Sequence, residues 1–178
     1  MRIAVSGAHR VGKTTLIDTL SALLPDHVVV DEPYVQLEDE GHDFEAVPSI
    51  DDFEAQLRRS LRDLRDIEGP AIFDRSPLDF MAYLACHDDA AAFDAAPWWP
   101  RLRQRLRSLD AIVFVGVEQP DRVDVDGEDR RWRARVDASL RELLFDGVAR
   151  RPVIAVRGTP EQRAQQVLRA LQQRPTTR

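Results

Sequence analysis

The residues with the most specific chemical meaning lie near the start of the chain. They read Gly7-Ala8-His9-Arg10-Val11-Gly12-Lys13-Thr14 and fit the pattern G-x-x-x-x-G-K-[ST] at every fixed position. In such a loop, backbone N–H groups surround phosphate oxygens, the lysine reaches the β- and γ-phosphates, and the last hydroxyl binds Mg²⁺. The pattern predicts a nucleoside triphosphate site formed by Gly7, His9, Arg10, Val11, Gly12, Lys13, Thr14 and Thr15, with Thr14 as a metal ligand.

The basic composition of the chain singles out one of these residues. Among 25 lysine and arginine side chains, Lys13 is the only lysine. Arginine carries a planar fork of donors, whereas lysine is a compact point charge on a flexible stem. Phosphates reached from inside a tight loop need the compact, flexible cation of lysine. We therefore expect Lys13 to contact the β- and γ-phosphates.

The segments on either side of this loop have the character that the motif requires. Arg2–Ser6 is a short strand-like run, and Thr15–Leu24 has apolar residues at helical spacing until Pro25 ends it. Strand, loop and helix in this order place the phosphates at a helix N-terminus.

The rest of the chain alternates between predicted strands and helices. This alternation predicts a single α/β domain over residues 1–173, with a five-stranded parallel sheet, helices on both faces, and a frayed tail at 174–178. An acidic segment without periodicity, Glu38–Ser49, is expected to be a mobile loop. The other four strands are predicted at 27–31, 70–74, 111–117 and 152–156, and further helices at 53–67, 78–86, 98–109, 132–144 and 160–171.

Polar residues follow the second and third predicted strands, and ligands of open parallel sheets bind beyond these carboxyl ends. Asp74 follows an apolar run and is the best candidate for a second metal ligand, although it could instead cap the helix after Pro77. Glu32 could accept a proton from a hydroxyl group, and Asp31 is a rival for that role. Arg75 could act on phosphate or only pair with the neighbouring acids.

Arg130, Arg131, Arg133 and Arg135 precede and enter the predicted helix at 132–144. Arginines that close over a triphosphate would neutralise its charge and exclude water. Arg131 and Arg135 are four residues apart and share a helix face, so they are the candidates that we name. The sequence itself does not distinguish between the four, and a solvated arginine face is the alternative.

The order of these features resembles that of the P-loop kinases of small molecules, most closely the deoxynucleoside kinases and the nicotinamide-riboside kinase group. The resemblance implies that Glu32 is the base on the acceptor hydroxyl, that Asp74 works at Mg²⁺ with Arg75 near acceptor and phosphates, and that the arginine-rich stretch is a lid. It also implies that Gly158, Thr159 and Pro160 touch the adenine. The His9-Arg10-Val11 part of the loop instead resembles a broad group of bacterial ATP-binding proteins known only as ATPase-like.

Composition excludes other classes of function. The net charge of −6 argues against general nucleic-acid binding, and the basic run Arg101–Arg107 has the leucine spacing of a solvated amphipathic helix. No apolar stretch is long enough for a membrane span, and the single Cys86 cannot form an internal disulfide. We therefore expect a cytoplasmic protein, monomeric or homodimeric. Trp98 and Trp99 are expected to pack in the core, although one could stack on a flat acceptor.

Together these features predict an ATP- and Mg²⁺-dependent phosphotransferase that acts on a hydroxyl of a small molecule, with a nucleoside-like acceptor favoured. The main alternative is a nucleotide-dependent switch or regulatory ATPase without an acceptor. A module that binds nucleotide without chemistry is a third reading. A GTPase is disfavoured because a chain whose only lysine is Lys13 has no Asn-Lys-x-Asp guanine motif.

Overall fold

A computed structural model describes residues 1–118, 121, 123, 127–147 and 149–173 of the chain, with the backbone alone at Glu128. The predicted frayed tail at 174–178 lies outside the described residues. So does most of the segment between 118 and 127 that leads into the arginine-rich stretch.

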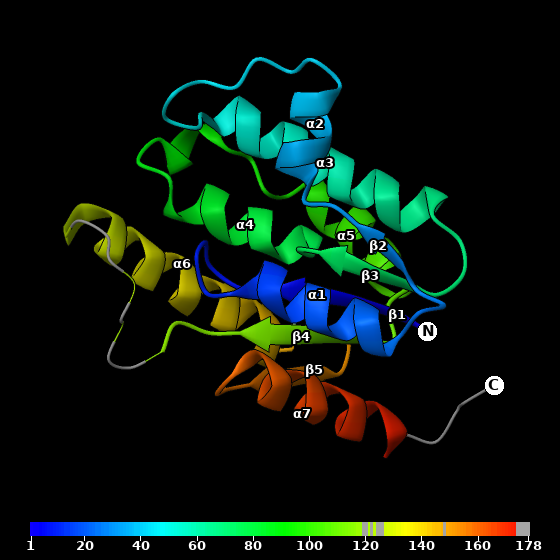
Figure 1. Cartoon of the computed structure of the whole chain (residues 1–178). Coiled ribbons are helices and arrows are strands. Elements are labelled where there is room, and N and C mark those ends of the chain that lie inside the picture. The colour runs from blue at the N-terminus through cyan, green and yellow to red at the C-terminus, as the bar shows by residue number, and fades with distance from the viewer. Residues whose placement is uncertain (119–120, 122, 124–126, 148, 174–178) are drawn as a thin grey trace.

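Five parallel strands form the centre of the molecule, as predicted (Figure 1). The strand order is β2-β3-β1-β4-β5, and every neighbouring pair is parallel. The side chains of β1 and β4 are almost all buried, which is expected of strands covered by helices on both faces. The strands are β1 (Arg2–Ser6), β2 (Val28–Val30), β3 (Ala71–Asp74), β4 (Ala111–Val115) and β5 (Val153–Val156).

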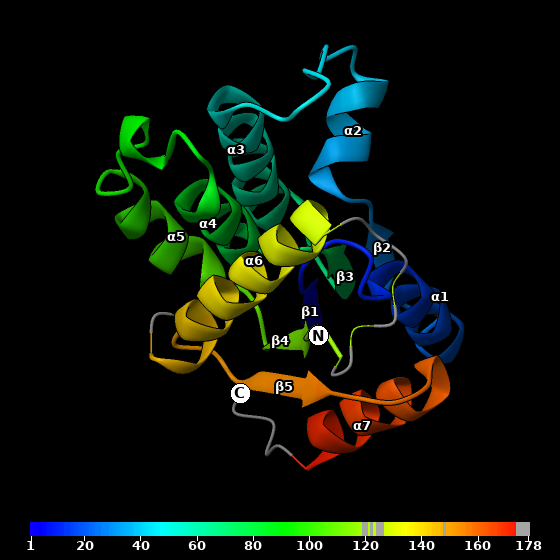
Figure 2. The same cartoon turned by 90° about the vertical axis from the view of Figure 1, so that its left-hand side faces the viewer.

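Two layers of helices cover the sheet. Figure 2 shows α1 and α7 on one side of it and α3, α4, α5 and α6 on the other. The structure thus confirms the prediction of a parallel sheet with helices on both faces. The helices are α1 (Lys13–Leu23), α2 (Pro33–Asp39), α3 (Ile50–Asp66), α4 (Pro77–Cys86), α5 (Trp98–Leu106), α6 (Gly127–Phe145) and α7 (Pro160–Gln172), with a short 3-10 turn at Ala90–Ala92.

The helix α2 has no counterpart among the predicted helices. It is seven residues long and buries only Pro33, so it shows no apolar period in the sequence. The helix begins directly after Glu32 because proline is well suited to the first turn, where no backbone N–H is needed.

The register of the sheet brings the functional segments to one edge. Val5 of β1 lies opposite Asp74 of β3, and Ser6 lies opposite Phe114 of β4. The Arg75 backbone N–H donates to the Val5 carbonyl at 3.0 Å, which continues the pairing beyond the end of β3. The phosphate loop and the residues after β3 therefore leave the sheet side by side.

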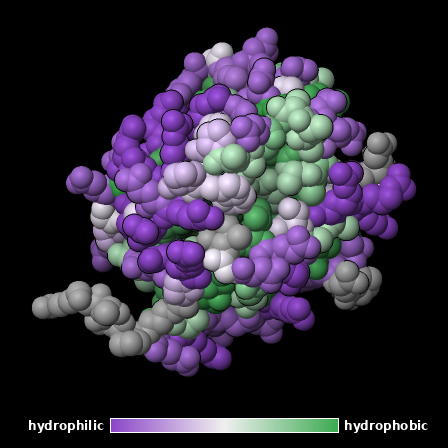
Figure 3. Space-filling view, turned by 180° about the vertical axis from the view of Figure 1, so that it is seen from behind, coloured by the Kyte–Doolittle hydropathy of each residue, from purple (hydrophilic) through white to green (hydrophobic). Residues whose placement is uncertain are grey.

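The outer surface is mixed in character. The face opposite that of Figure 1 carries hydrophilic side chains around a hydrophobic patch (Figure 3). Among the described residues, no helix combines the length and hydrophobicity needed to cross a membrane.

Candidate functional site

The phosphate loop is held in a shape that two of its glycines make possible. A Cβ on Gly7 would lie 2.2 Å from the carbonyl oxygen of Val115, so no larger residue fits there. Gly12 precedes α1 with φ of 86°, a left-handed conformation that glycine adopts without strain. No side chain caps α1 in the described part of the chain, so its first-turn N–H groups remain open to an anion.

Lys13 lies inside this loop. Its side chain is buried, and its Nζ donates to the Ala8 carbonyl at 3.0 Å. Burial, together with the charge of Arg75, lowers the pKa of Lys13 to about 8, against the opposing effect of Asp74 and Glu32. An anion bound in the loop would stabilise the charged ammonium.

Asp74 ends β3 next to this lysine and has an unused oxygen. Its Oδ1 is buried without a hydrogen-bond partner in the described residues. Burial raises the pKa of Asp74 to about 6, although the charge of Lys13 opposes the shift. Asp74 does not cap α4, because Ser76 is the N-cap residue.

These features fit a Mg²⁺ site of the kind that is completed by phosphates. Mg²⁺ prefers oxygen ligands and is commonly held by one or two carboxylates together with substrate phosphates and water. Thr14 and Thr15 are exposed at the start of α1, on the same sheet edge as Asp74. Among the described residues, no three acidic, histidine or cysteine side chains form a cluster that could hold a metal ion.

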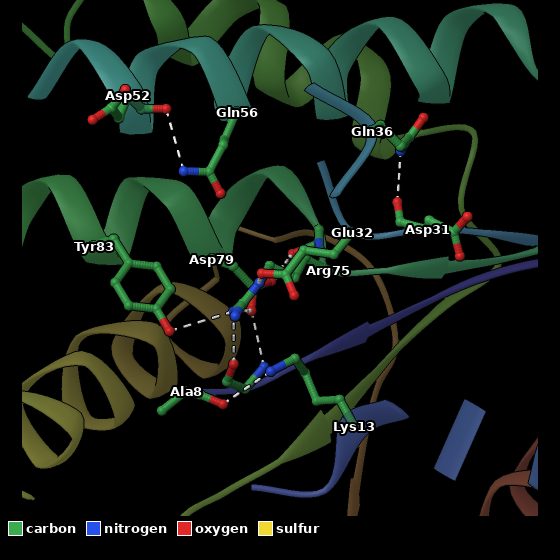
Figure 4. Close-up of polar contacts among 12 residues, drawn as sticks. Ala8, Lys13, Asp31, Glu32, Gln36, Asp52, Gln56, Arg75, Asp79 and Tyr83 are labelled. Carbon is green, nitrogen blue, oxygen red and sulfur yellow. Dashed lines mark hydrogen bonds and ion pairs between the residues drawn. The ribbon is translucent and has the colours of Figure 1, made fainter. Parts of the chain in front are cut away.

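Glu32 and Arg75 form an ion pair at the centre of the site (Figure 4). Arg75 Nε donates to Glu32 Oε1, and Arg75 Nη1 donates to the Gly7 carbonyl at 3.1 Å. Burial would raise the pKa of Glu32, but the charges of Arg75 and Lys13 outweigh it and hold the pKa below its usual value. Arg75 itself has φ of 80°, an uncommon conformation for a non-glycine residue.

Asp31, the rival of Glu32, lies outside this group. Its side chain is exposed, and its backbone carbonyl accepts from Gln36 Nε2 at 2.6 Å (Figure 4). The geometry therefore favours Glu32 over Asp31 as the acid of the site.

Asp79 belongs to the site although the sequence reasoning did not name it. It is fully buried and accepts from the Gly7 N–H and from the N–H and hydroxyl of Ser76, each at 2.9 Å. It thereby joins the start of α4 to the start of the phosphate loop. The signal in the sequence is the capping box, a Ser followed three residues later by an acid.

The arginines of α6 differ in burial and in whether they contact the phosphate loop, and the sequence alone does not show which is which. Arg133 is buried, donates from Nε to the His9 carbonyl at 3.1 Å, and pairs with Asp121 at 2.6 Å. Arg131 is exposed, and Arg135 donates to the carbonyl of Cys86 at 2.7 Å, so the structure does not bring these two to the phosphate loop. The reason is helical phase, because Arg133 shares the buried face of α6 with Val136 and Leu140.

The other residues of the loop contact neighbouring elements. His9 Nε2 lies 2.5 Å from Asp129 Oδ1 at the start of α6, while Arg10 is exposed. The Val11 carbonyl accepts from Arg163 Nη1 at 2.9 Å, and Arg163 also pairs with Glu118. Arg163 is thus a further positioning residue that the sequence reasoning did not name.

Gly158, Thr159 and Pro160 lie at the start of α7, one turn before Arg163. Thr159 caps this helix through a capping box with Gln162. Since α7 packs against α1, these three residues begin a helix that runs beside the phosphate-loop helix.

An aromatic cavity of about 200 Å³ opens beside the Glu32–Arg75 pair. Gln56 places an amide in its wall, and His9 lines it from the phosphate loop. Trp98 and Trp99 lie elsewhere, on α5, and Trp98 is buried beneath the guanidinium of Arg58. The aromatic lining consists of Tyr34, Phe53, Phe80, Tyr83 and Trp132.

The glycine-rich loop between β1 and α1, the parallel sheet and the acid at the end of β3 define a P-loop protein with the fold of the nucleoside and nucleotide kinases. A protein-family model described as "AAA domain" matches residues 2–163, and the chain belongs to that family. No curated protein matches the chain.

Several solved structures share this fold. Deoxyadenosine kinase from M. mycoides, with dCMP and a flexible dCDP bound, aligns with a TM-score of 0.66 and 15% identity over 97% of this chain and 98% of that one. Shikimate kinase from Aquifex aeolicus gives a TM-score of 0.57 and 18% identity over 97% and 96%. NadR in complex with NAD and AMP-PNP gives a TM-score of 0.68 and 16% identity, over 99% of this chain and 51% of that chain. At these low sequence identities, the comparison shows only that the fold is shared.

Proposed function

We propose that this protein transfers the γ-phosphoryl group of ATP to a hydroxyl of a small, flat-ringed molecule, with a nucleoside-like acceptor favoured. The observation that carries the proposal is the position of Arg75. Its guanidinium contacts the Gly7 carbonyl of the phosphate loop and the Glu32 carboxylate, and it lines the aromatic cavity. One side chain therefore connects the donor side of the site to the acceptor side.

The donor side would hold ATP and Mg²⁺. The chemistry that Mg²⁺ would supply there is neutralisation of the charge that develops on the transferred group. Thr14 and Asp74 are the residues that would hold it, since Asp74 Oδ1 is buried and unused. Lys13 and the open N–H groups at the start of α1 would bind the β- and γ-phosphates.

The acceptor side has an ionised acid ready to take a proton. The pKa of Glu32 is held below its usual value, so its carboxylate is charged at neutral pH but weakly basic, and it would orient the hydroxyl and accept its proton as the bond to phosphorus forms. The acceptor oxygen then bonds to the γ-phosphorus, while the bond from that phosphorus to the β–γ bridging oxygen breaks and ADP leaves. Arg75 would orient Glu32 and offset the charge of the phosphoryl group in flight.

The cavity lining supports a flat acceptor. Aromatic faces from α2, α3, α4 and α6 surround a space of about 200 Å³, and Phe53 and Tyr83 stack with their planes 6° apart. A heteroaromatic ring could stack in such a space, and the Gln56 amide offers it both a donor and an acceptor. The M. mycoides and NadR structures, which hold dCMP and NAD, make nucleosides the first class to test.

The proposal is tested by measuring ADP release from ATP and Mg²⁺ in the presence of pooled nucleosides, sugars and other alcohols. We expect a nucleoside-like compound to stimulate release, and Glu32→Gln to lower kcat about 10²–10⁴-fold, the usual contribution of a general base. Asp31→Asn is the matched control and should leave the rate within about twofold.

Two outcomes would contradict this assignment. Acceptor-independent hydrolysis that no compound stimulates would favour a regulatory ATPase. A Glu32→Gln enzyme with unchanged stimulated turnover would remove Glu32 from the reaction while leaving the kinase itself in place.

A further inference from the structure

A basic groove lies between α3 and α5, apart from the phosphate loop and the aromatic cavity. Its volume is about 390 Å³. It shares no lining residue with the aromatic cavity, although α3 lines both. Its arginines are Arg58, Arg62 and Arg65 of α3 and Arg101 and Arg105 of α5.

Helical spacing explains how five arginines come to face one space. Arg58, Arg62 and Arg65 are spaced four and three residues apart, so they form one stripe along α3. Arg101 and Arg105, four residues apart, form a shorter stripe on α5. The two helices pack against each other, and the stripes border the groove from opposite sides.

The base of the groove is apolar and buried. Leu61 and Trp98 both line it, and they are 8% exposed. The guanidinium of Arg58 lies 5.3 Å from the centre of the Trp98 ring. This contact holds one cation over a rigid surface and limits the freedom that it would lose on binding a ligand.

The acids near the groove balance only part of its charge. Arg58 pairs with Glu54, and Arg65 pairs with Asp66, whose pKa is lowered first by its hydrogen bond to Arg65 and also by the charges of Arg62 and Arg105. In the described part of the chain, no hydrogen bond or ion pair engages the guanidinium groups of Arg62, Arg101 and Arg105. Like charges at this spacing repel one another, and one carboxylate, Asp66, offsets only part of the repulsion among Arg62, Arg65 and Arg105.

We propose that this groove binds a small molecule that carries several phosphate groups. Guanidinium forks match phosphate oxygens in pairs, so two facing stripes suit a ligand with adjacent phosphates. The volume of the groove falls within the range of small-ligand sites, about 300–1,000 Å³. A long polyanion such as nucleic acid is disfavoured by the net charge of −6 on the chain as a whole.

Inorganic tripolyphosphate is the probe for this site, titrated by calorimetry at constant ionic strength. Wild-type protein should bind two equivalents, one in the phosphate loop and one in the groove. Lys13→Ala should lose the first, and the double variant Arg62→Gln/Arg101→Gln should weaken the second about tenfold or more, as expected for lost charge-assisted hydrogen bonds. Because these two arginines are exposed, the double variant should fold normally.

The matched control is Arg103→Gln/Arg107→Gln, which removes the same charge from two exposed positions outside the groove, one on α5 and one at its C-cap. It should weaken groove affinity clearly less than the Arg62/Arg101 double variant does, because Arg103 and Arg107 do not line the groove and act on its ligand only through solvent-screened charge. Equal weakening by both double variants would reduce the effect to general electrostatics and overturn the proposal. A single equivalent in wild-type protein that Lys13→Ala abolishes would also overturn it.

Single-stranded DNA serves as the second probe. Binding of a short oligonucleotide more tightly than tripolyphosphate, at equal phosphate concentration and with the same dependence on Arg62 and Arg101, would assign the groove to nucleic acid instead. None of these results depends on whether the protein is a kinase.

Discussion

At the scale of single residues, Lys13 gives the clearest expectation. Its side chain is only 6% exposed and fits within the loop with Nζ against the Ala8 carbonyl. A guanidinium keeps the charge but is wider and planar, so it cannot occupy the same space. Lys13→Arg should lower kcat/KM about 10²–10³-fold, the usual cost of one lost donor to transition-state charge.

Steady-state kinetics with the acceptor found by screening would measure this loss. Exposed Arg10→Lys serves as the reference change in the same loop and should stay within about tenfold of wild type. Near-normal turnover of Lys13→Arg would mean that the loop accepts either cation and that the lysine is retained for another reason.

Asp74 provides a prediction of pH dependence. Burial raises its pKa to about 6 from an ordinary value of 3.8. Between these two values the folded protein holds a proton that the unfolded chain has released, so the contribution of Asp74 to stability falls as the pH rises through about 4 to 6. Above pH 6 the shift corresponds to a cost of up to about 3 kcal/mol.

Asp74→Asn removes the charge and therefore this cost. Without nucleotide or metal, the variant should be more stable than wild type by about 2 kcal/mol at pH 7.5, and the difference should shrink towards pH 4. Urea unfolding across this pH range in the presence of a chelator would measure it, with Asp31→Asn as the exposed control. A variant that is less stable than wild type at pH 7.5 would show that the Asp74 carboxylate stabilises the fold.

At the scale of elements, α4 and the phosphate loop depend on the same buried acid. Asp79 closes the capping box of α4 and also accepts from the Gly7 N–H. Asp79→Ala should lower the free energy of unfolding by about 2–3 kcal/mol, because it leaves buried donors unsatisfied. It should also weaken ATP binding, since the N–H of Gly7, the first residue of the loop, loses its hydrogen bond to the Asp79 carboxylate.

The α3 helix offers the matched control, because it begins with a capping box that lies apart from the loop. Ser49→Ala removes that cap and should cost about 1 kcal/mol with no change in the Kd for ATP. Denaturation and nucleotide titration of the two variants would separate stability from binding. Equal effects on ATP affinity would show that Asp79 acts through general stability alone.

The elements themselves were largely predictable from sequence, and their relative rotation was not. Continuous apolar runs identified all five strands. This follows from burial on both faces for β1, β3 and β4, whereas the edge strands β2 and β5 leave some of their apolar residues exposed. Spacing alone does not show which side of α6 faces the loop, so it indicates Arg131 and Arg135, whereas the structure brings Arg133 to the His9 carbonyl. The short α2 lacks an apolar stripe, so its period was too weak to detect.

At the scale of the whole molecule, the phosphate loop was predictable and the acceptor cavity was not. The loop is local in sequence, so the continuous stretch from Gly7 to Thr14 contains its full pattern. The cavity is built by side chains from four helices, among them Tyr34, Phe80 and Trp132, that only the tertiary fold brings together. The sequence offers Trp98 or Trp99 for stacking on an acceptor, whereas the fold places Trp132 in the cavity.

The last prediction tests whether these two parts form one site. Arg75 contacts both, so a single inhibitor that joins a nucleoside to adenosine through an oligophosphate should occupy both at once. Linking makes the second binding event intramolecular, and the linked compound should bind at least about a hundredfold more tightly than either half. Competition calorimetry would measure this gain, with Lys13→Ala and Trp132→Ala each expected to reduce it and Trp99→Ala, on α5, expected to leave it intact. No gain for linkers of several lengths would show that the aromatic cavity does not deliver its ligand to the phosphate loop, and would separate the acceptor assignment from the nucleotide site.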